Sequence, residues 1–114
     1  MIFTAYIFKV NQECEKSIRD ILRFVINRTQ FKSGCIQSSL WSNDDSSQLM
    51  LYELWRSRSD LEKHMTTAVY GKLLVALEMG TEKPLIRFAE CVNIDGIELI
   101  ENILTRKSDF LTQV

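Results

Sequence analysis

The sequence predicts a single α+β domain in which helices cover one face of a four-stranded antiparallel sheet. Strand-like runs and amphipathic helices follow one another in the order strand, helix, strand, strand, helix pair, strand and tail helix. A short polar connection between the second and third strands favours a hairpin, and a hydrophobic content of 46% suits one core. This order is typical of a ferredoxin-like split β-α-β fold, here with an extra C-terminal helix.

The first strand and the first helix are each predicted by their own periodicity. Residues 2–10 are rich in aromatic and branched side chains, which favours a strand whose alternate residues point to opposite faces. In residues 13–28, apolar side chains recur at helical spacing and charged residues take the other side. We therefore expect this helix to cover one face of the sheet.

A turn and a hairpin are predicted next. Ser33-Gly34 is a turn signal before a second strand at 35–41, and the polar loop 43–47 leads into a third strand at 48–55. Because the connection is short, the two strands should pair antiparallel.

Two short helices and a fourth strand complete the domain, which we expect to span residues 1–94. Ser59-Asp60-Leu61-Glu62 has capping-box spacing, so one helix should start there, and a second is predicted at 69–79. Residues 85–94 are predicted as the fourth strand. Residues 95–114 should form a C-terminal helix and tail whose isoleucine and leucine stripe packs on the rest of the protein.

The helices of this order can cover only one face of the sheet. We expect the other face to be too apolar for contact with water, and therefore to be buried against a second copy of the chain or to enclose a ligand. The residues expected on that face are Phe3, Ile7, Leu49, Leu51 and Trp55.

The length and charge of the chain limit the functions that it can serve. Its 114 residues suffice for one core but not for a separate cofactor domain. A net charge of -1 gives no reason to expect nucleic acid, and no apolar run approaches the roughly 20 residues of a membrane helix. The N-terminus also lacks the features of a signal peptide. We expect a cytoplasmic protein whose partners are small molecules or protein, with no nucleic acid and no membrane.

Signals for metals and cofactors are absent from the sequence. Cys14, Cys35 and Cys91 are scattered, and no CxxC accompanies the single histidine. The four glycines are isolated, so no phosphate-binding loop is present. We expect buried thiols, no metal site and no nucleotide or flavin cofactor.

The candidate site lies in residues 48–70, which hold the third strand, the next helix and the only histidine. Glu53 shares a strand face with Trp55 among large apolar residues, which is typical either of a pocket wall or of a satisfied core position. His64 is expected at the edge of the buried stripe of its helix.

His64 and Trp55 are the candidate catalytic residues. A neutral histidine, with an ordinary pKa of about 6.5, can accept a proton from a substrate, and a tryptophan can stack on an aromatic ring. The alternatives are that His64 bonds to local backbone and that Trp55 is a core or interface anchor. The candidate substrate-binding residues are Leu51, Glu53, Tyr70 and Arg87. For Arg87, a surface salt bridge is an equally good explanation.

Four short segments also carry a family resemblance. They are the Ser33-Gly34-Cys35 turn, LYELW at 51–55, SRSDLEKHM at 57–65 and VYGKLL at 69–74. In order and spacing they resemble the antibiotic biosynthesis monooxygenase domain of the dimeric α/β-barrel superfamily, over residues 1–92. The resemblance implies a homodimer with facing sheets and a pocket between sheet and helices. It also implies oxygenation of quinol-like or polyphenolic substrates without metal or flavin.

The chain departs from the characterised branches of that family. Leu51 stands where polyketide-oxidising members carry an asparagine, and Ile7 where haem-degrading members carry one. The second of the paired helices also lacks the ligand histidine of the haem-degrading members. Two alternatives therefore stay open: an isomerase or lyase that uses His64 and Glu53 for proton transfer, and a non-catalytic binding or dimerisation module.

Overall fold

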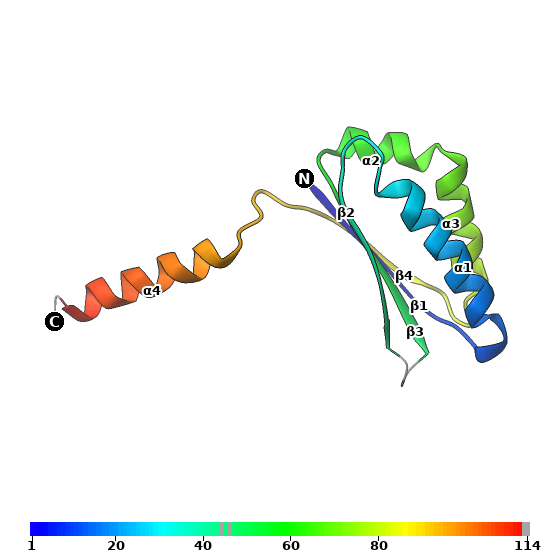
Figure 1. The fold of residues 1–114 in the computed structure, drawn as a ribbon, viewed down its shortest axis with the longest axis horizontal. Helices are drawn as coiled ribbons and strands as arrows, with labels where there is room; N and C mark the ends of the chain where they lie inside the picture. Colours follow the sequence, from blue (N-terminus) through cyan, green and yellow to red (C-terminus); the bar gives the residue numbers. More distant parts are fainter. Residues whose placement is uncertain (44, 46, 113–114) are drawn as a thin grey trace.

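The computed structural model describes residues 1–43, 45 and 47–112, the last five of these by their backbone alone. Two positions of the predicted polar loop, 44 and 46, and the last two residues of the predicted tail lie outside the described residues. The elements are β1 (Ile2–Lys9), α1 (Gln12–Thr29), β2 (Cys35–Asn43), β3 (Gln48–Trp55), α2 (Arg58–Met65), α3 (Ala68–Glu78), β4 (Leu85–Glu90) and α4 (Ile97–Thr112). This is the order that the sequence predicts (Figure 1).

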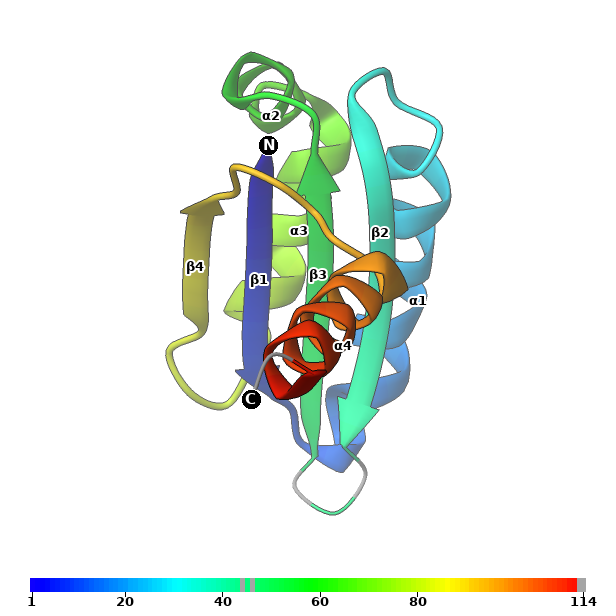
Figure 2. The same ribbon diagram turned by 90° about the vertical axis from the view of Figure 1, so that its left-hand side faces the viewer.

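The strands form one antiparallel sheet with the order β2-β3-β1-β4. β1 lies between β3 and β4, with Thr4 opposite Glu53 on one side and Phe88 on the other. On β2, Ser38 is opposite Glu53. α1, α2 and α3 all lie on one face of this sheet, as Figures 1 and 2 show. The fold is therefore the predicted ferredoxin-like split β-α-β, with a sheet that is not closed.

The core lies between these helices and the sheet. Because side chains alternate along a strand, every second residue of β1 and β3 points toward the helices. The buried residues on this face include Ile2, Tyr6, Phe8, Leu49, Leu51 and Trp55. The helices bury Ile18, Leu22 and Val25 of α1 and Leu73, Ala76 and Leu77 of α3 against them.

The face away from the helices carries a different set of residues from the one expected. The prediction that Leu49, Leu51 and Trp55 lie on this open face is wrong, because the strand register places them against the helices. Strand alternation shows which residues share a face, but not which of the two faces the helices cover. Of the predicted set, only Phe3 and Ile7 lie on the open face.

The N-cap of α2 is Ser57 and not Ser59. The Ser57 hydroxyl accepts a hydrogen bond from the Asp60 N–H at 3.1 Å and donates one to the Asp60 carboxylate at 2.9 Å. The hydrogen bond from the Arg56 N–H to the Gly34 carbonyl, at 2.7 Å, ends β3 just before it. Ser57 follows the end of β3 with an extended backbone, which allows its side chain to cap the helix. The capping motif therefore begins at Ser57, two positions earlier than the sequence pattern predicts.

Gly34 allows a test of the turn before β2. Its φ of 88° lies in the left-handed region, and a Cβ at this position would overlap the Asp60 side chain. Gly34→Ala is therefore expected to lower the free energy of unfolding by about 1–3 kcal/mol. Gly71→Ala is the matched control, because a Cβ there meets nothing within 4 Å, and it should stabilise α3 by about 0.5–1 kcal/mol. Urea unfolding measures both, and an unchanged midpoint for Gly34→Ala would contradict the turn geometry.

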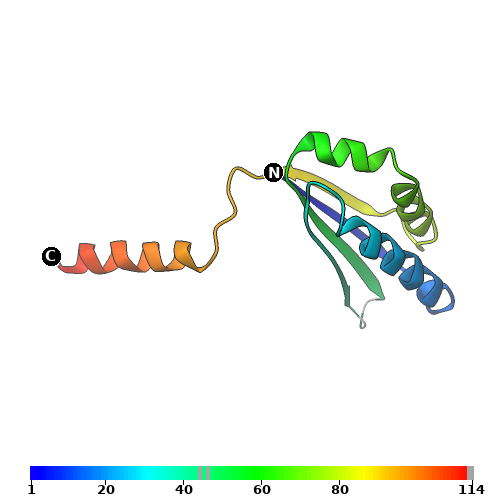
Figure 3. The ribbon, with the colours of Figure 1, turned by 45° about the horizontal axis from the view of Figure 1, so that its top comes forward.

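α4 does not pack on the rest of the chain. It projects from the open face of the sheet, as Figures 1, 2 and 3 show. The radius of gyration, 18.3 Å, exceeds the value of about 13 Å typical of a compact chain of this length. The prediction that the apolar stripe of α4 packs on the protein is therefore wrong for the single chain, because the linker 91–96 carries the helix away. Neither α4 nor any other described helix is long and apolar enough to cross a membrane.

Candidate functional site

A row of polar side chains crosses the helix-facing side of the sheet. Ser38, Glu53 and Thr4 are neighbours on β2, β3 and β1. The Thr4 hydroxyl donates to Glu53 Oε1 at 3.4 Å, and the Trp55 indole N–H donates to the same oxygen at 3.3 Å. Glu53 Oε2 and the Ser38 hydroxyl are buried without a hydrogen-bond partner among the described residues. Because buried polar atoms are normally paired, this row is a candidate for function.

His64 and Tyr70 cover this row from α2 and α3. The His64 ring stacks on Trp55 with ring centroids 4.6 Å apart and planes at 29°, and Tyr70 meets it edge-on with centroids 5.4 Å apart. The Tyr70 and Tyr6 hydroxyl oxygens lie 3.1 Å apart, within hydrogen-bonding distance. Thr67 positions both rings, since its hydroxyl donates to the His64 carbonyl at 2.7 Å and accepts from the Tyr70 N–H at 3.3 Å.

Burial makes Glu53 a carboxyl group that exchanges protons near neutral pH. Its side chain is almost fully buried, which raises its pKa to about 7 even though the hydrogen bonds from Trp55 and Thr4 lower it. Burial also raises the pKa of Tyr6 and Tyr70, so both phenols stay protonated. A group with a pKa near the working pH is suited to general acid or base catalysis.

His64 is a neutral ring with two free nitrogen atoms. It is 2% exposed, and burial first and the Lys32 cation second lower its pKa to about 4. Neither Nδ1 nor Nε2 has a hydrogen-bond partner among the described residues, so the ring does not bond to local backbone there. An unpaired buried polar atom costs about 1–3 kcal/mol, which a ligand that supplies a donor would recover. The ring is also buried more deeply than the edge position that the sequence predicts.

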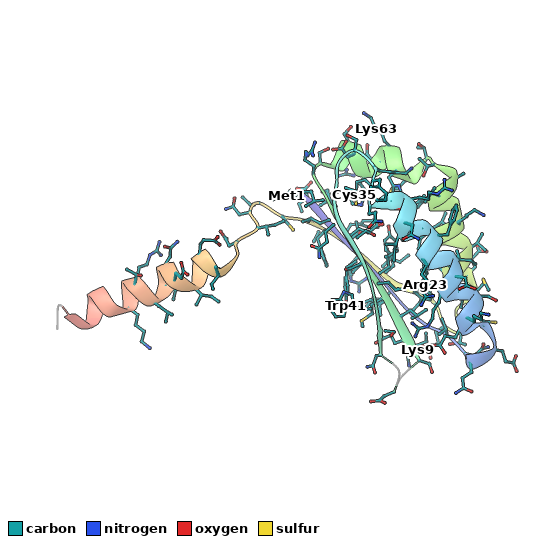
Figure 4. All side chains as sticks on the ribbon, in the orientation of Figure 1. Met1, Lys9, Arg23, Cys35, Trp41 and Lys63 are labelled. Carbon is teal, nitrogen blue, oxygen red and sulfur yellow. The ribbon has the colours of Figure 1, made fainter. Side chains whose placement is uncertain are left out.

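An open cleft of about 290 Å³ reaches His64 and Trp55 from the surface. The two stacked rings form its floor, and Lys32 and Lys63 are cationic members of its lining; Lys63 is labelled on α2 in Figure 4. The volume lies at the small end of ligand pockets, about 300–1,000 Å³, and suits a molecule of one or two rings. Ser33, Asp60 and Thr67 complete the lining.

A larger hollow of about 350 Å³ lies beside α2 and β4. Its charged lining residues, Arg58, Glu62 and Glu90, are exposed. It therefore offers no buried, unpaired polar atom to a ligand, and we place the candidate site at the cleft over His64.

Four of the predicted site residues come together in the structure. Glu53, Trp55, His64 and Tyr70 form one buried cluster under α2 and α3. Leu51 is fully buried in the core and does not line the cleft.

The structure does not bring Arg87 to this cluster. Arg87 pairs with Ala5, whose position faces away from the helices, so it lies on the open face. Its guanidinium donates to the Ile86 carbonyl at 3.0 Å, and no salt bridge to another described residue explains it.

Several residues of the site carry little signal in the sequence. The spacing of Thr4 and Tyr6 shows that they share a strand face, but only the register of β1 against β3 brings them to Glu53. Lys32 lies in the turn before β2, where neither periodicity nor a motif distinguishes it from other surface lysines. That such residues belong to the site can be recognised only from the structure, in which segments distant in sequence pack together.

The described part of the chain holds no group of three His, Cys, Asp or Glu side chains that could bind a metal ion. Cys14, Cys35 and Cys91 are free thiols and are half-buried rather than buried as expected. Burial raises the pKa of the Cys35 thiol to about 11, so that it stays protonated at neutral pH.

Solved structures share this fold. Rv0793 from Mycobacterium tuberculosis is 21% identical, with a TM-score of 0.75 over 83% of this chain and 98% of that chain. A Nitrosomonas europaea protein provisionally named an antibiotic biosynthesis monooxygenase is 18% identical, with a TM-score of 0.73 over 82% of this chain and 100% of its own. A protein described as an antibiotic biosynthesis monooxygenase is 14% identical, with a TM-score of 0.72 over 82% of this chain and 100% of its own. At these identities the likeness shows the fold alone, and no curated protein matches the sequence.

The sequence itself matches a family model. Residues 1–74 match the model described as antibiotic biosynthesis monooxygenase, which covers more than half of the chain. The matched part runs from β1 into α3 and includes Glu53, Trp55, His64 and Tyr70. It confirms the resemblance carried by the short segments of the sequence. The chain belongs to the antibiotic biosynthesis monooxygenase family.

Proposed function

We propose that the protein is a cofactor-independent monooxygenase that binds a small phenol or quinol in the cleft over His64 and oxidises it with dioxygen. The observation that carries the proposal is the His64 ring, which is buried at the cleft floor, neutral at physiological pH and unpaired at both nitrogen atoms. Membership of the family supports an oxygenase and leaves its substrate open.

The lining of the cleft suits an aromatic substrate that ionises. Trp55 is fully buried and stacks on His64, so it holds the His64 ring in place at the floor of the cleft. Both His64 nitrogen atoms are buried in the free protein, so the cleft lining must open for a substrate hydroxyl to donate to one of them. Lys32 and Lys63 line the same cleft, and nearby cations lower the pKa of a phenol and so favour the phenolate. Glu53 accepts a hydrogen bond from the Trp55 indole N–H at 3.3 Å and thereby positions the Trp55 ring beneath His64.

The proposed reaction uses dioxygen as the only oxidant. The phenolate is the electron-rich form that transfers an electron to dioxygen, after which a carbon–oxygen bond forms at a ring carbon ortho or para to it that carries a hydrogen atom. Loss of the proton from that carbon and cleavage of the oxygen–oxygen bond then give a quinone carbonyl and water. The substrate loses four electrons, one oxygen atom enters the product and the other leaves as water, so no external reductant is required.

A proton-transfer isomerase is the second candidate function. Its support is the pKa of Glu53, about 7, because a carboxyl group that titrates near neutral pH can both remove and return a proton. Such a reaction would use His64 and Glu53 as a pair and would consume no oxygen.

Isotopically labelled dioxygen distinguishes the two candidates. With a panel of phenols and quinols that carry a hydrogen atom on a ring carbon ortho or para to a hydroxyl, we expect oxygen uptake to equal product formation, with one labelled atom in the quinone. Turnover of an enolisable substrate without oxygen uptake would favour the isomerase. Saturable binding of these phenols without turnover would overturn both enzymatic proposals and would leave a binding module.

We also propose that the protein acts as a homodimer in which a second copy covers the open face of the sheet. Phe3, Trp41 and Leu85 on this face are 37%, 60% and 44% exposed. Trp41 is labelled on this side of the sheet in Figure 4. Large exposed apolar surface of this kind is typical of a protein interface.

A further inference from the structure

α4 has an apolar side that its own chain leaves uncovered. An isolated helix of this length is only marginally stable in water, and most helices in proteins are stabilised by packing of one face. Exposed apolar side chains of this number also favour aggregation. α4 therefore needs a surface to lie on. The exposed residues are Ile97, Leu99, Ile100, Ile103 and Leu104, each between 47% and 65% exposed.

The linker 91–96 fixes where α4 begins. Backbone hydrogen bonds of 2.8 and 3.2 Å tie Cys91 to the first residue of the chain. Ile94 then lines a hollow of about 250 Å³ on the open face, together with Phe3 and Tyr52. Beyond this point α4 runs away from its own sheet, as Figures 1 and 3 show. Its apolar side is therefore presented to another molecule.

We propose that α4 lies along the strands on the open sheet face of a second copy of the chain, and that the α4 of that copy lies on the first in return. The inference rests on the proposed homodimer and names the segment that makes the contact. Each chain has one unpartnered apolar face on its sheet and one on α4, and this exchange covers both at once.

The dimensions of the two surfaces agree. α4 has 16 residues and is about 24 Å long at 1.5 Å per residue. The eight residues of β1 span about 26 Å. Stable interfaces use roughly 20–30 residues from each partner. The strands have 8, 9, 8 and 6 residues, and only half of these point to the open face. The sheet alone therefore offers fewer residues than a stable interface needs, and α4 supplies the additional ones.

The charges of the two surfaces also complement each other. Arg87 lies on the open face and forms no salt bridge with another described residue. α4 carries Glu98 and Glu101 in its first turns, and Glu101 lies one turn after the apolar Ile97. A partner α4 on the open face would bring these carboxylates to Arg87, and opposite charges across an interface fix its register.

Two charge-reversed proteins test the exchange when they are mixed. The first is Arg87→Glu, and the second is the double variant Glu98→Lys with Glu101→Lys. In a dimer of either variant alone, like charges meet at both contacts. In a mixed dimer one contact pairs the new glutamate with the new lysines and the other keeps the natural pair. We expect each variant alone to dimerise at least about tenfold more weakly than the wild type, and the equimolar mixture to recover wild-type affinity in sedimentation equilibrium.

Each of the other possible results contradicts the dimer, the contact made by α4 or the exchange between the two chains. A wild-type protein that is monomeric at micromolar concentration would overturn both the dimer and the exchange. Dimerisation of both variants as tight as that of the wild type would leave the dimer and overturn the contact by α4. Weak variants without recovery in the mixture would mean that α4 contacts Arg87 of its own chain. Circular dichroism melting curves establish that the variants are folded in each case.

Discussion

His64→Phe is expected to lower turnover by on the order of 10²–10⁴-fold, the usual scale for a lost general base, while the fold is retained. Phenylalanine keeps an aromatic ring near Trp55 and Tyr70, which contact the His64 ring with centroids 4.6 and 5.4 Å away. It removes both nitrogen atoms, and these have no partner among the described residues, so the folded state loses no hydrogen bond there. Steady-state rates with any phenol that the protein oxidises, together with the melting temperature, measure the two effects separately.

His64→Gln is the companion variant, since it keeps hydrogen-bonding capacity but not basicity, and it should lose nearly as much activity. Glu62→Gln is the matched control, because Glu62 is exposed on the same helix and does not line the cleft. In the wild type, activity should decline as the pH approaches about 4, where the His64 ring takes up a proton and can no longer accept one. Full turnover in both histidine variants with a loss of several kcal/mol in stability would show that His64 is structural.

The order of the elements is predictable because each element carries its own periodicity. The bounds predicted for the third strand, 48–55, are those of β3. The fourth strand was predicted to reach residue 94, but β4 ends at Glu90. The sequence continues to be strand-like after this residue, but the regular pairing with β1 ends with Ile2 opposite Glu90, and one further pair of backbone hydrogen bonds joins Cys91 to Met1 before the linker leaves the sheet. The end of a strand is therefore set by its pairing in the sheet and not by local sequence alone.

The candidate site was predictable only where its residues are close in sequence. Glu53 and Trp55 are two apart on one strand, so alternation places them on one face. Arg87 lacks such a neighbour, and its face depends on the register between β1 and β4. The pKa values of Glu53 and His64 likewise depend on burial by helices that pack from elsewhere in the chain. Patterns in the sequence show which residues share a surface, whereas packing determines what that surface meets.

Stability is expected to depend on pH in opposite directions for variants at Glu53 and His64. The pKa of Glu53 rises from 4.5 to about 7 on folding, so the folded state binds more protons than the unfolded state between these values. Its contribution to stability is therefore lost as the pH rises through this window. The pKa of His64 falls from 6.5 to about 4, so the unfolded state binds more protons there. Its contribution is lost as the pH falls through that window.

In the wild type the two contributions oppose each other between pH 4.5 and 6.5, where the windows overlap. Glu53→Gln removes one of them, so the stability of this variant should rise with pH relative to the wild type. His64→Phe removes the other, and its stability should fall with pH relative to the wild type. Each difference should approach about 3 kcal/mol across its window, because one pKa unit corresponds to about 1.4 kcal/mol. Other groups titrate alike in all three proteins, so urea unfolding at a series of pH values isolates these two. Differences of the same sign, or none, would mean that the two groups are not buried together as the structure places them.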